Sequence, residues 1–211
     1  MDVKDRFYIP DNLKVFGKWD TDIAVEDLGI KSYVNLTPTA VLHTAGRHQK
    51  RRFWKNKMNI VERLANKMMR SGSAGRKVGG RFLRRHGGYT GKKQATYRTL
   101  KLAFEDINKK TKQNPLEVLV KALEYAGPRE EVTTLSYGGI KYHLSVDTGS
   151  QRRLDMALRN IALGASLKTF KTKKKFHETL AEEIILASKG EMASFSVNKK
   201  EEIERIAKSA R

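Results

Sequence analysis

Cations and aromatic rings alternate in residues 43–57, which read HTAGRHQKRRFWKNK. Lys and Arg side chains bind phosphates, and a flat aromatic ring can stack on an unpaired base. The composition is therefore typical of an RNA-contacting arm. Phe53 and Trp54 could instead anchor the arm to the core, and the sequence leaves both roles open. The candidate RNA-binding residues of this arm are Arg47, Lys50, Arg51, Arg52, Phe53, Trp54, Lys55 and Lys57.

A second basic stretch is rich in glycine. Residues 71–91 hold 7 of the 16 glycines of the chain, and glycine this dense disfavours a helix because its backbone entropy is large. We expect a loop that becomes ordered only when it is bound, and a flexible connector with incidental charge is the alternative. The candidate RNA-binding residues here are Arg76, Lys77, Arg81, Arg84 and Arg85.

Two partial matches to enzyme motifs do not complete their chemistry. The stretch from His86 to Lys93 resembles a phosphate-binding loop, but His86 replaces the first glycine and Lys93 replaces the final Ser or Thr. His177 begins a zinc-protease pattern whose second histidine would fall at Ala181. With zero Cys and no histidines at metal-ligand spacing, we expect no catalytic residue, no metal site and no cofactor.

The charge of the chain is concentrated in its middle. The 211 residues carry 43 Lys+Arg and 23 Asp+Glu, a net charge of +20. Residues 1–42 are net −2, residues 43–101 are net +17 with Glu62 as their one acid, and residues 102–211 are net +5. Solvated helix faces normally mix both signs. We therefore expect a nucleic acid as the partner, with an anionic membrane surface as a distant second.

Length and composition favour one folded domain with extensions rather than a disordered tail. The N-terminus runs into no apolar signal region, and no stretch approaches the roughly 20 apolar residues of a spanning helix. The sequence predicts a cytoplasmic protein without a membrane partner.

Six helices are expected to position these charges. Asn59, Asn114 and Asn198 are each followed three residues later by Glu, a pattern that marks helix starts. Pro115 supports the second start and Gly127-Pro128 ends that helix. The 3.6-residue spacing of apolar residues predicts three more helices, one from near Lys92 and two others through residues 154–162 and 176–187.

Residues 132–146, VTTLSYGGIKYHLSV, break the helical rhythm. Gly138-Gly139 between two alternating runs predicts a β-hairpin with a two-residue turn. In this register Tyr137 pairs with Ile140, Leu135 with Tyr142, and Thr133 with Leu144. We expect the tip to project toward a partner, although a hairpin leaning on the helices is also compatible with the pattern.

Several motifs, in order along nearly the whole chain, resemble the universal small-subunit ribosomal protein seven family in its archaeal form, whose eukaryotic counterpart is small-subunit protein five. They are FGKW at 16–19, HTAGR at 43–47, IVERL at 60–64, NPLEVL at 114–119, GPRE at 127–130, VD at 146–147, QRR at 151–153 and the ending at 199–211.

The resemblance implies a mainly α fold of about six helices with one protruding β-hairpin, a basic arm and an N-terminal extension. It implies binding to the 3′ major domain of small-subunit rRNA, nucleation of head assembly, and a place near the messenger exit channel, exit-site tRNA and proteins nine and eleven. Carried over by position, the RNA face gains Lys92, Lys93, Arg152 and Arg153. The exit-site hairpin has its tip at Tyr137, Gly138, Gly139, Ile140, Lys141 and Tyr142.

The predicted organisation is an extension over residues 1–42 and an RNA-binding domain over residues 43–211. A bacterial relative would lack the part before about residue 32. The Gly/Arg window, residues 71–91, is longer than in the eukaryotic form, so contacts cannot be carried over to it. The competing classes are a nucleic-acid enzyme, which a metal-dependent nuclease assay would detect, and a DNA-compacting protein, which would bind duplex DNA as well as rRNA.

Overall fold

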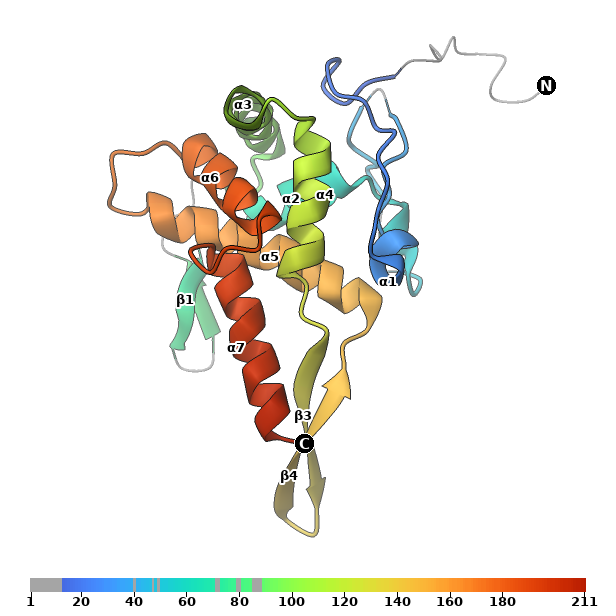
Figure 1. Cartoon of the computed structure of the whole chain (residues 1–211), viewed down its shortest axis with the longest axis vertical. Helices are drawn as coiled ribbons and strands as arrows, with labels where there is room; N and C mark the ends of the chain where they lie inside the picture. The colour runs from blue at the N-terminus through green and yellow to red at the C-terminus, as the bar shows by residue number, and fades with distance from the viewer. Residues whose placement is uncertain are drawn as a thin grey trace, which may run out of the picture.

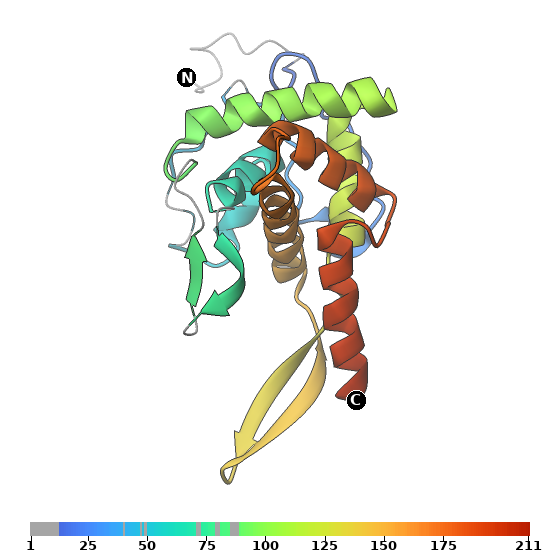
Figure 2. The ribbon, with the colours of Figure 1, turned by 90° about the vertical axis from the view of Figure 1, so that its left-hand side faces the viewer.

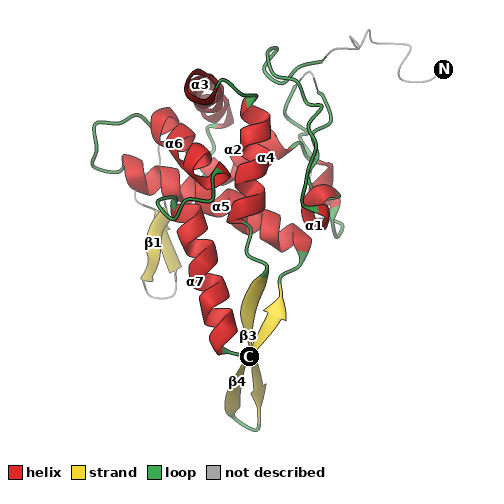
Figure 3. Ribbon diagram, viewed as in Figure 1, coloured by secondary structure: helices red, strands yellow, loops and turns green. Residues whose placement is uncertain are grey.

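The computed structural model describes residues 13–39, 41–46, 48, 50–70, 73–78, 81–84 and 89–211, with the backbone alone described for 73–78 and 81–84. The described chain is mainly helical, which confirms the predicted fold class (Figure 3). The helices are α1 (Leu28–Lys31), the short 3₁₀ helix η2 (Trp54–Lys57), α2 (Ile60–Met68), α3 (Lys93–Thr111), α4 (Pro115–Ala126), α5 (Ser150–Thr169), α6 (Phe176–Ser188) and α7 (Phe195–Ser209). The strands are β1 (Ser73–Val78), β2 (Arg81–Arg84), β3 (Glu130–Tyr137) and β4 (Ile140–Asp147).

Two of the three predicted Asn caps are confirmed. The side chain of Asn59 accepts a hydrogen bond from the backbone N–H of Val61 at the start of α2. Asn114 accepts one from Leu116 at the start of α4, whose first residue is the proline that has no N–H to satisfy. Both caps satisfy donors that a helix N-terminus leaves open, so local sequence fixes where these helices begin.

The predicted start of the last helix at Asn198 is wrong. Helix α7 begins at Phe195 and is capped by Ser194, which accepts from Val197 N. The carboxylate of Glu183, fully buried on α6, accepts hydrogen bonds from Ser194 Oγ at 2.7 Å and from Ser196 N at 2.9 Å. A carboxylate at a helix N-terminus is stabilising, and this tertiary contact overrides the local signal at Asn198.

Helix α5 lies at the centre of the body, with α2, α4, α6 and α7 packed around it (Figure 1). Its fully buried side chains include Leu154, Leu158 and Ile161. Gly164 lies where a Cβ would come within 2.8 Å of Phe195 Cβ, so the start of α7 approaches the α5 backbone closely. A helix buried on several sides at the centre gives the surface elements a rigid support.

The described residues before the arm, 13–39 and 41–42, pack against the helical body. Phe16 makes edge contacts with Tyr97 and Phe104, and Val15 is buried in the core. Farther along, the carboxylate of Glu124 on α4 accepts hydrogen bonds from the backbone N–H groups of residues 26 and 27. The described part of the expected extension therefore contributes to the core rather than standing apart from it.

The predicted hairpin forms with the predicted register. Strands β3 and β4 pair antiparallel with Tyr137 opposite Ile140 and Leu135 opposite Tyr142. Gly138 and Gly139 both have positive φ, +56° and +83°, as a primed turn requires. Figure 2 shows α3 across one end of the body and the hairpin extending from the other end, beside α7. The tip projects, as expected.

The interpretation of residues 71–91 as a loop is wrong for ten of its residues. Strands β1 and β2 pair antiparallel, with Lys77 opposite Phe82, Val78 opposite Arg81, and an irregularity between Ser73 and Lys77. The sequence places Gly79-Gly80 between the two runs, the same signal that predicted the other hairpin. The high glycine content of residues 71–91 was interpreted as a loop, and the strand pattern on either side of Gly79-Gly80 was not recognised.

Candidate nucleic-acid interface

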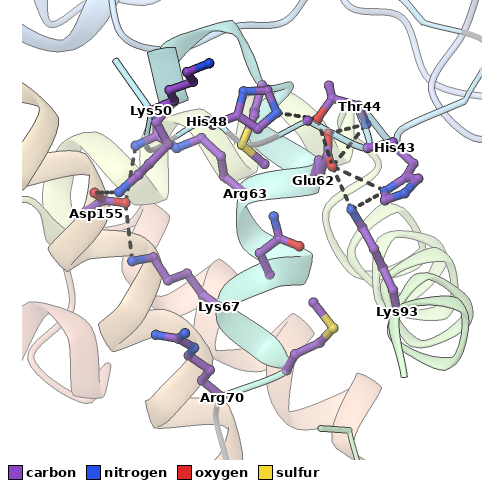
Figure 4. A pocket seen from close by; sticks show the side chains of 16 residues that line it. His43, Thr44, His48, Lys50, Glu62, Arg63, Lys67, Arg70, Lys93 and Asp155 are labelled. Carbon is purple, nitrogen blue, oxygen red and sulfur yellow. Dashed lines mark hydrogen bonds and ion pairs between the residues drawn. The ribbon is translucent and has the colours of Figure 1, made fainter. Parts of the chain in front are cut away.

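Helix α2 forms one wall of an open groove of about 1100 Å³ (Figure 4). The groove is also lined by the segment before α2, by the first residue of α3 and by Asp155 on α5. Arg63 and Lys67 follow the i, i+4 spacing that places side chains on one stripe of a helix, and Arg70 follows just after the helix ends. The six Lys and Arg side chains that line it are Lys50, Lys55, Arg63, Lys67, Arg70 and Lys93.

Glu62, the one acid of the basic middle segment, is buried under the arm instead of being solvated. Its carboxylate accepts a hydrogen bond from Lys93 Nζ at 2.6 Å and lies 3.2 Å from Thr44 N through each oxygen. His43 Nδ1 lies 2.6 Å from the same Lys93 Nζ, and Thr44 Oγ1 contacts His48 Nε2 at 2.6 Å. Glu62 thus fastens the start of the arm to the N-terminus of α3.

Asp155 holds the opposite side of the groove. Lys55 Nζ lies 3.0 Å from its carboxylate, and Arg63 Nη2 and Lys67 Nζ each lie 3.3 Å from it. Burial acts to raise the pKa of Asp155, but the three cations outweigh it and hold that pKa below its ordinary value. Burial lowers the pKa of Lys67, and the attraction of Asp155 only partly offsets that. One carboxylate therefore gathers three positive charges.

Phe53 and Trp54 lie on the surface of the arm, outside the buried core. Phe53 is 45% exposed, has φ +63° and makes an edge contact with Tyr33 at 6.1 Å between ring centroids. The guanidinium of Arg52 lies 4.7 Å from the Phe53 ring centroid, and that of Arg51 lies 5.3 Å from the Trp54 ring. The rings are therefore paired with cations at a surface where a base could stack.

The two arginines after the hairpin differ in their surroundings. Arg152 is exposed, and its Nε lies 2.7 Å from Glu131 at the base of β3. Arg153 is buried and donates to Asp27 Oδ2 at 2.8 Å, so it connects the segment around α1 to α5. Burial works to raise the pKa of Asp27, and the contact with Arg153 lowers it below its ordinary value. The resemblance alone did not indicate this structural position for Arg153.

Other predicted contact residues divide into three groups. Lys92 is exposed beside Lys93 at the start of α3, and Lys57 is exposed at the end of η2. Strands β1 and β2 contain Arg76, Lys77, Arg81 and Arg84, for which only the backbone is described. Arg47 and Arg85 lie outside the described residues.

Sequence reasoning missed the cations on α2 and both groove carboxylates. A signal for Arg63 and Lys67 was present, because they share one face of a helix that the sequence predicted, and Arg70 follows directly after that helix. Nothing local marks Asp155, which lies 92 residues from Arg63 along the chain. Among the residues with described side chains, no group of three or more His, Cys, Asp or Glu could hold a metal ion, and no described helix is long and apolar enough to span a membrane.

A helical body with a basic groove, cation-paired aromatic rings and a projecting hairpin defines a nucleic-acid-binding protein. Comparison with known proteins narrows this class. Residues 30–211 match the family model described as ribosomal protein S7p/S5e. The small ribosomal subunit protein uS7 of Methanococcus maripaludis (strain C6 / ATCC BAA-1332) is 52% identical over 201 residues, which cover 94% of this chain and 99% of that protein.

The chain belongs to the ribosomal protein S7p/S5e family. The family resemblance noted from the sequence is confirmed. RNA binding and a structural role in the small ribosomal subunit follow from the family, and rRNA and other ribosomal components are the partners that such a role implies.

Proposed function

We propose that residues 43–211 bind the 3′ major domain of small-subunit rRNA and help to nucleate assembly of the head. The particular rRNA domain and the role in assembly are taken from the family resemblance, and the structural observation that supports RNA binding is the charge of the groove. Six Lys and Arg side chains line it against two carboxylates, Glu62 and Asp155, and each of those carboxylates is already paired within the protein. The surplus positive charge favours a polyanion.

The groove and the arm would act together on folded RNA. Lys and Arg contacts to phosphates fix the register of the RNA without reading its sequence. Phe53, half exposed on the arm, offers a ring face to an unpaired base. Glu62 and the buried core behind α2 keep these groups in place, so little ordering cost falls on binding.

The hairpin would serve a second contact. From the family resemblance we propose that its tip, Tyr137–Tyr142, lies near exit-site tRNA and the messenger exit channel, with proteins nine and eleven as neighbours. The projection of β3 and β4 from the body supports a role at a distance from the groove (Figure 2).

A filter-binding titration with an rRNA fragment tests the groove. If roughly 8 phosphates are neutralised, the logarithm of the affinity should fall with the logarithm of salt concentration at a slope of about −6 to −7. Duplex DNA of equal length serves as the comparison ligand, and equal affinity for it would favour a DNA-compacting protein. A slope near zero would exclude a phosphate-dominated interface.

Replacing Arg51 and Arg52 by alanine should weaken binding of the rRNA fragment about tenfold, because two phosphate contacts are lost. The matched control is Lys109→Ala with Lys110→Ala, which removes the same charge from the other end of α3, roughly 24 Å from Lys93 at 1.5 Å per residue. Equal losses in both variants would show that only net charge matters.

Replacing Val132–Val146 by a short Gly–Ser turn should leave affinity for the rRNA fragment intact. The same variant should alter exit-site tRNA occupancy in reconstituted subunits. Unchanged occupancy would argue against a hairpin contact at that site and leave the groove proposal standing.

A further inference from the structure

The three cations around Asp155 are not equivalent. Arg63 is 2% exposed at its side chain, and its Nη1 donates to the backbone carbonyl of Tyr33 at 3.1 Å while Nη2 reaches Asp155. Lys55 and Lys67 have side chains that are 30% and 29% exposed. Arg63 is therefore fixed between two acceptors, whereas the two lysines reach the carboxylate from the open side.

The lysines come from two different elements that border the groove. Lys55 lies in η2, at the foot of the arm, and Lys67 lies in the last turn of α2. Both ammonium groups contact the carboxylate of Asp155 on the buried helix α5, and Figure 4 shows Lys67 reaching it. The structure thus holds two flexible cations close together in a groove that is open to a large ligand.

The local charge is unbalanced even with Asp155 present. Three positive charges surround one negative charge, and Lys50 and Arg70 line the same groove. Burial is the main cause of the lowered pKa of Lys67. Asp155 counteracts it, and the neighbouring cations Lys55 and Arg63 add a smaller repulsion. A further anion would relieve this repulsion.

We propose that the carboxylate of Asp155 is an internal counter-ion, which binds Lys55 and Lys67 as an RNA phosphate would. When RNA enters the groove, these lysines exchange Asp155 for a backbone phosphate. This inference rests on the proposed function. Arg63 keeps its contact with Asp155 during the exchange because it is buried and anchored on Tyr33 O. The carboxylate is therefore never left without a partner.

This exchange makes Asp155 a competitor of the RNA, so removing its charge strengthens binding. Asp155→Asn preserves the shape of the side chain and an acceptor for Arg63, but it frees the two lysines. We expect the variant to bind the rRNA fragment roughly three- to tenfold more tightly than wild type, the gain expected when two part-exposed ion pairs no longer have to break.

The matched control is Glu117→Gln, which makes the same change in net charge on α4. Glu117 pairs with Lys121 across one helical turn, at 2.8 Å, and does not line the groove. We expect Glu117→Gln to change affinity by less than about twofold. An equal gain in both variants would assign the effect to net charge and overturn the proposal.

A double-mutant cycle locates the effect. In a chain that carries Lys55→Gln and Lys67→Gln, the further change Asp155→Asn should no longer raise affinity, because the exchanging groups are gone. A gain that persists in that background would show that Asp155 acts by another route and would overturn the proposal.

Thermal unfolding separates this role from a purely structural one. We expect free Asp155→Asn to unfold at a lower temperature than wild type, since Lys55 and Lys67 lose their ion pairs and Arg63 keeps only a neutral acceptor. We also expect it to gain more from added rRNA fragment. Weaker RNA binding by a folded Asp155→Asn protein would show that Asp155 preorganises the lysines and would contradict the exchange.

Two further ligands, poly-uridine and inorganic phosphate, distinguish a failure of this inference from a failure of the proposed function. If wild type fails to prefer the rRNA fragment over poly-uridine while Asp155→Asn still strengthens poly-uridine binding, the exchange stands and the specific rRNA assignment fails. Inorganic phosphate is tested against chloride at equal ionic strength. Saturable phosphate binding that responds in the same way to Asp155→Asn would assign the site to a free anion and overturn its assignment to RNA.

Discussion

The groove beside α2 and the hairpin β3–β4 have opposite surface chemistry. Cations line the groove, and its two carboxylates are held by several partners each. The apolar face of the hairpin is exposed, with Tyr137 at 81% and Ile140 at 60%, and Lys141 is the one Lys or Arg side chain on the two strands and their turn. The difference in surface chemistry suits the groove to a polyanion, whereas the hairpin tip offers mainly shape and apolar area to a partner.

The largest effect is expected at Glu62, because its removal disrupts the contacts that hold the groove together and leaves the hairpin unchanged. Glu62→Ala leaves Lys93 and Thr44 N without their shared acceptor and should lower the free energy of unfolding by about 3 kcal/mol. Urea denaturation measures this. Glu117→Ala, which breaks an exposed helical pair, should cost less than about 0.5 kcal/mol beyond its propensity change. A loss at Glu62 no larger than this control would contradict its anchoring role.

Acid should weaken the groove next. The pKa of Asp155 is held below its ordinary value against burial, so its ion pairs contribute stability above pH about 4 and lose it as pH falls through the lowered pKa. The stability of wild type and Asp155→Asn should therefore converge in acid, as followed by thermal unfolding between pH 7 and pH 2. A difference that stays constant over this range would contradict the assignment.

The hairpin turn should respond by a smaller amount. Gly139 has φ +83° with no atom within 4 Å of an added Cβ, so Gly139→Ala meets backbone strain without a steric clash. We expect a cost of about 1 kcal/mol. Gly139→Asn should cost about half as much, since Asn tolerates positive φ better. Affinity for the rRNA fragment should stay unchanged in both variants. A loss of affinity would indicate that the hairpin is part of the primary rRNA interface.

The smallest effect is expected on the apolar face of the hairpin. Leu135 and Tyr142 face each other across the strands and are both half exposed. Replacing both by Thr, a good strand former, should change the free energy of unfolding by less than about 0.5 kcal/mol per site. Binding of the rRNA fragment should stay within about twofold of wild type. A large loss of stability would show that this face packs on the body rather than being available to a partner.

Local patterns were sufficient for much of the fold. The caps at Asn59 and Asn114 and the register of β3 with β4 follow from hydrogen bonds and turn geometry within a few residues. The start of α7 and the strands β1 and β2 were predicted wrongly. In the first case Glu183, 11 residues before Ser194, decides the cap. In the second case glycine content was given more weight than strand alternation.

The sequence by itself determined that the positive charge gathers in residues 43–101, that the chain is mainly helical with one projecting hairpin, and which family it belongs to. Only the tertiary structure showed which carboxylates pair with these Lys and Arg side chains. Arg63 and Asp155 lie 92 residues apart in sequence, and Asp27 and Arg153 lie 126 apart. Caps and turns are local, whereas an ion pair forms only where packing of the core brings two distant elements together.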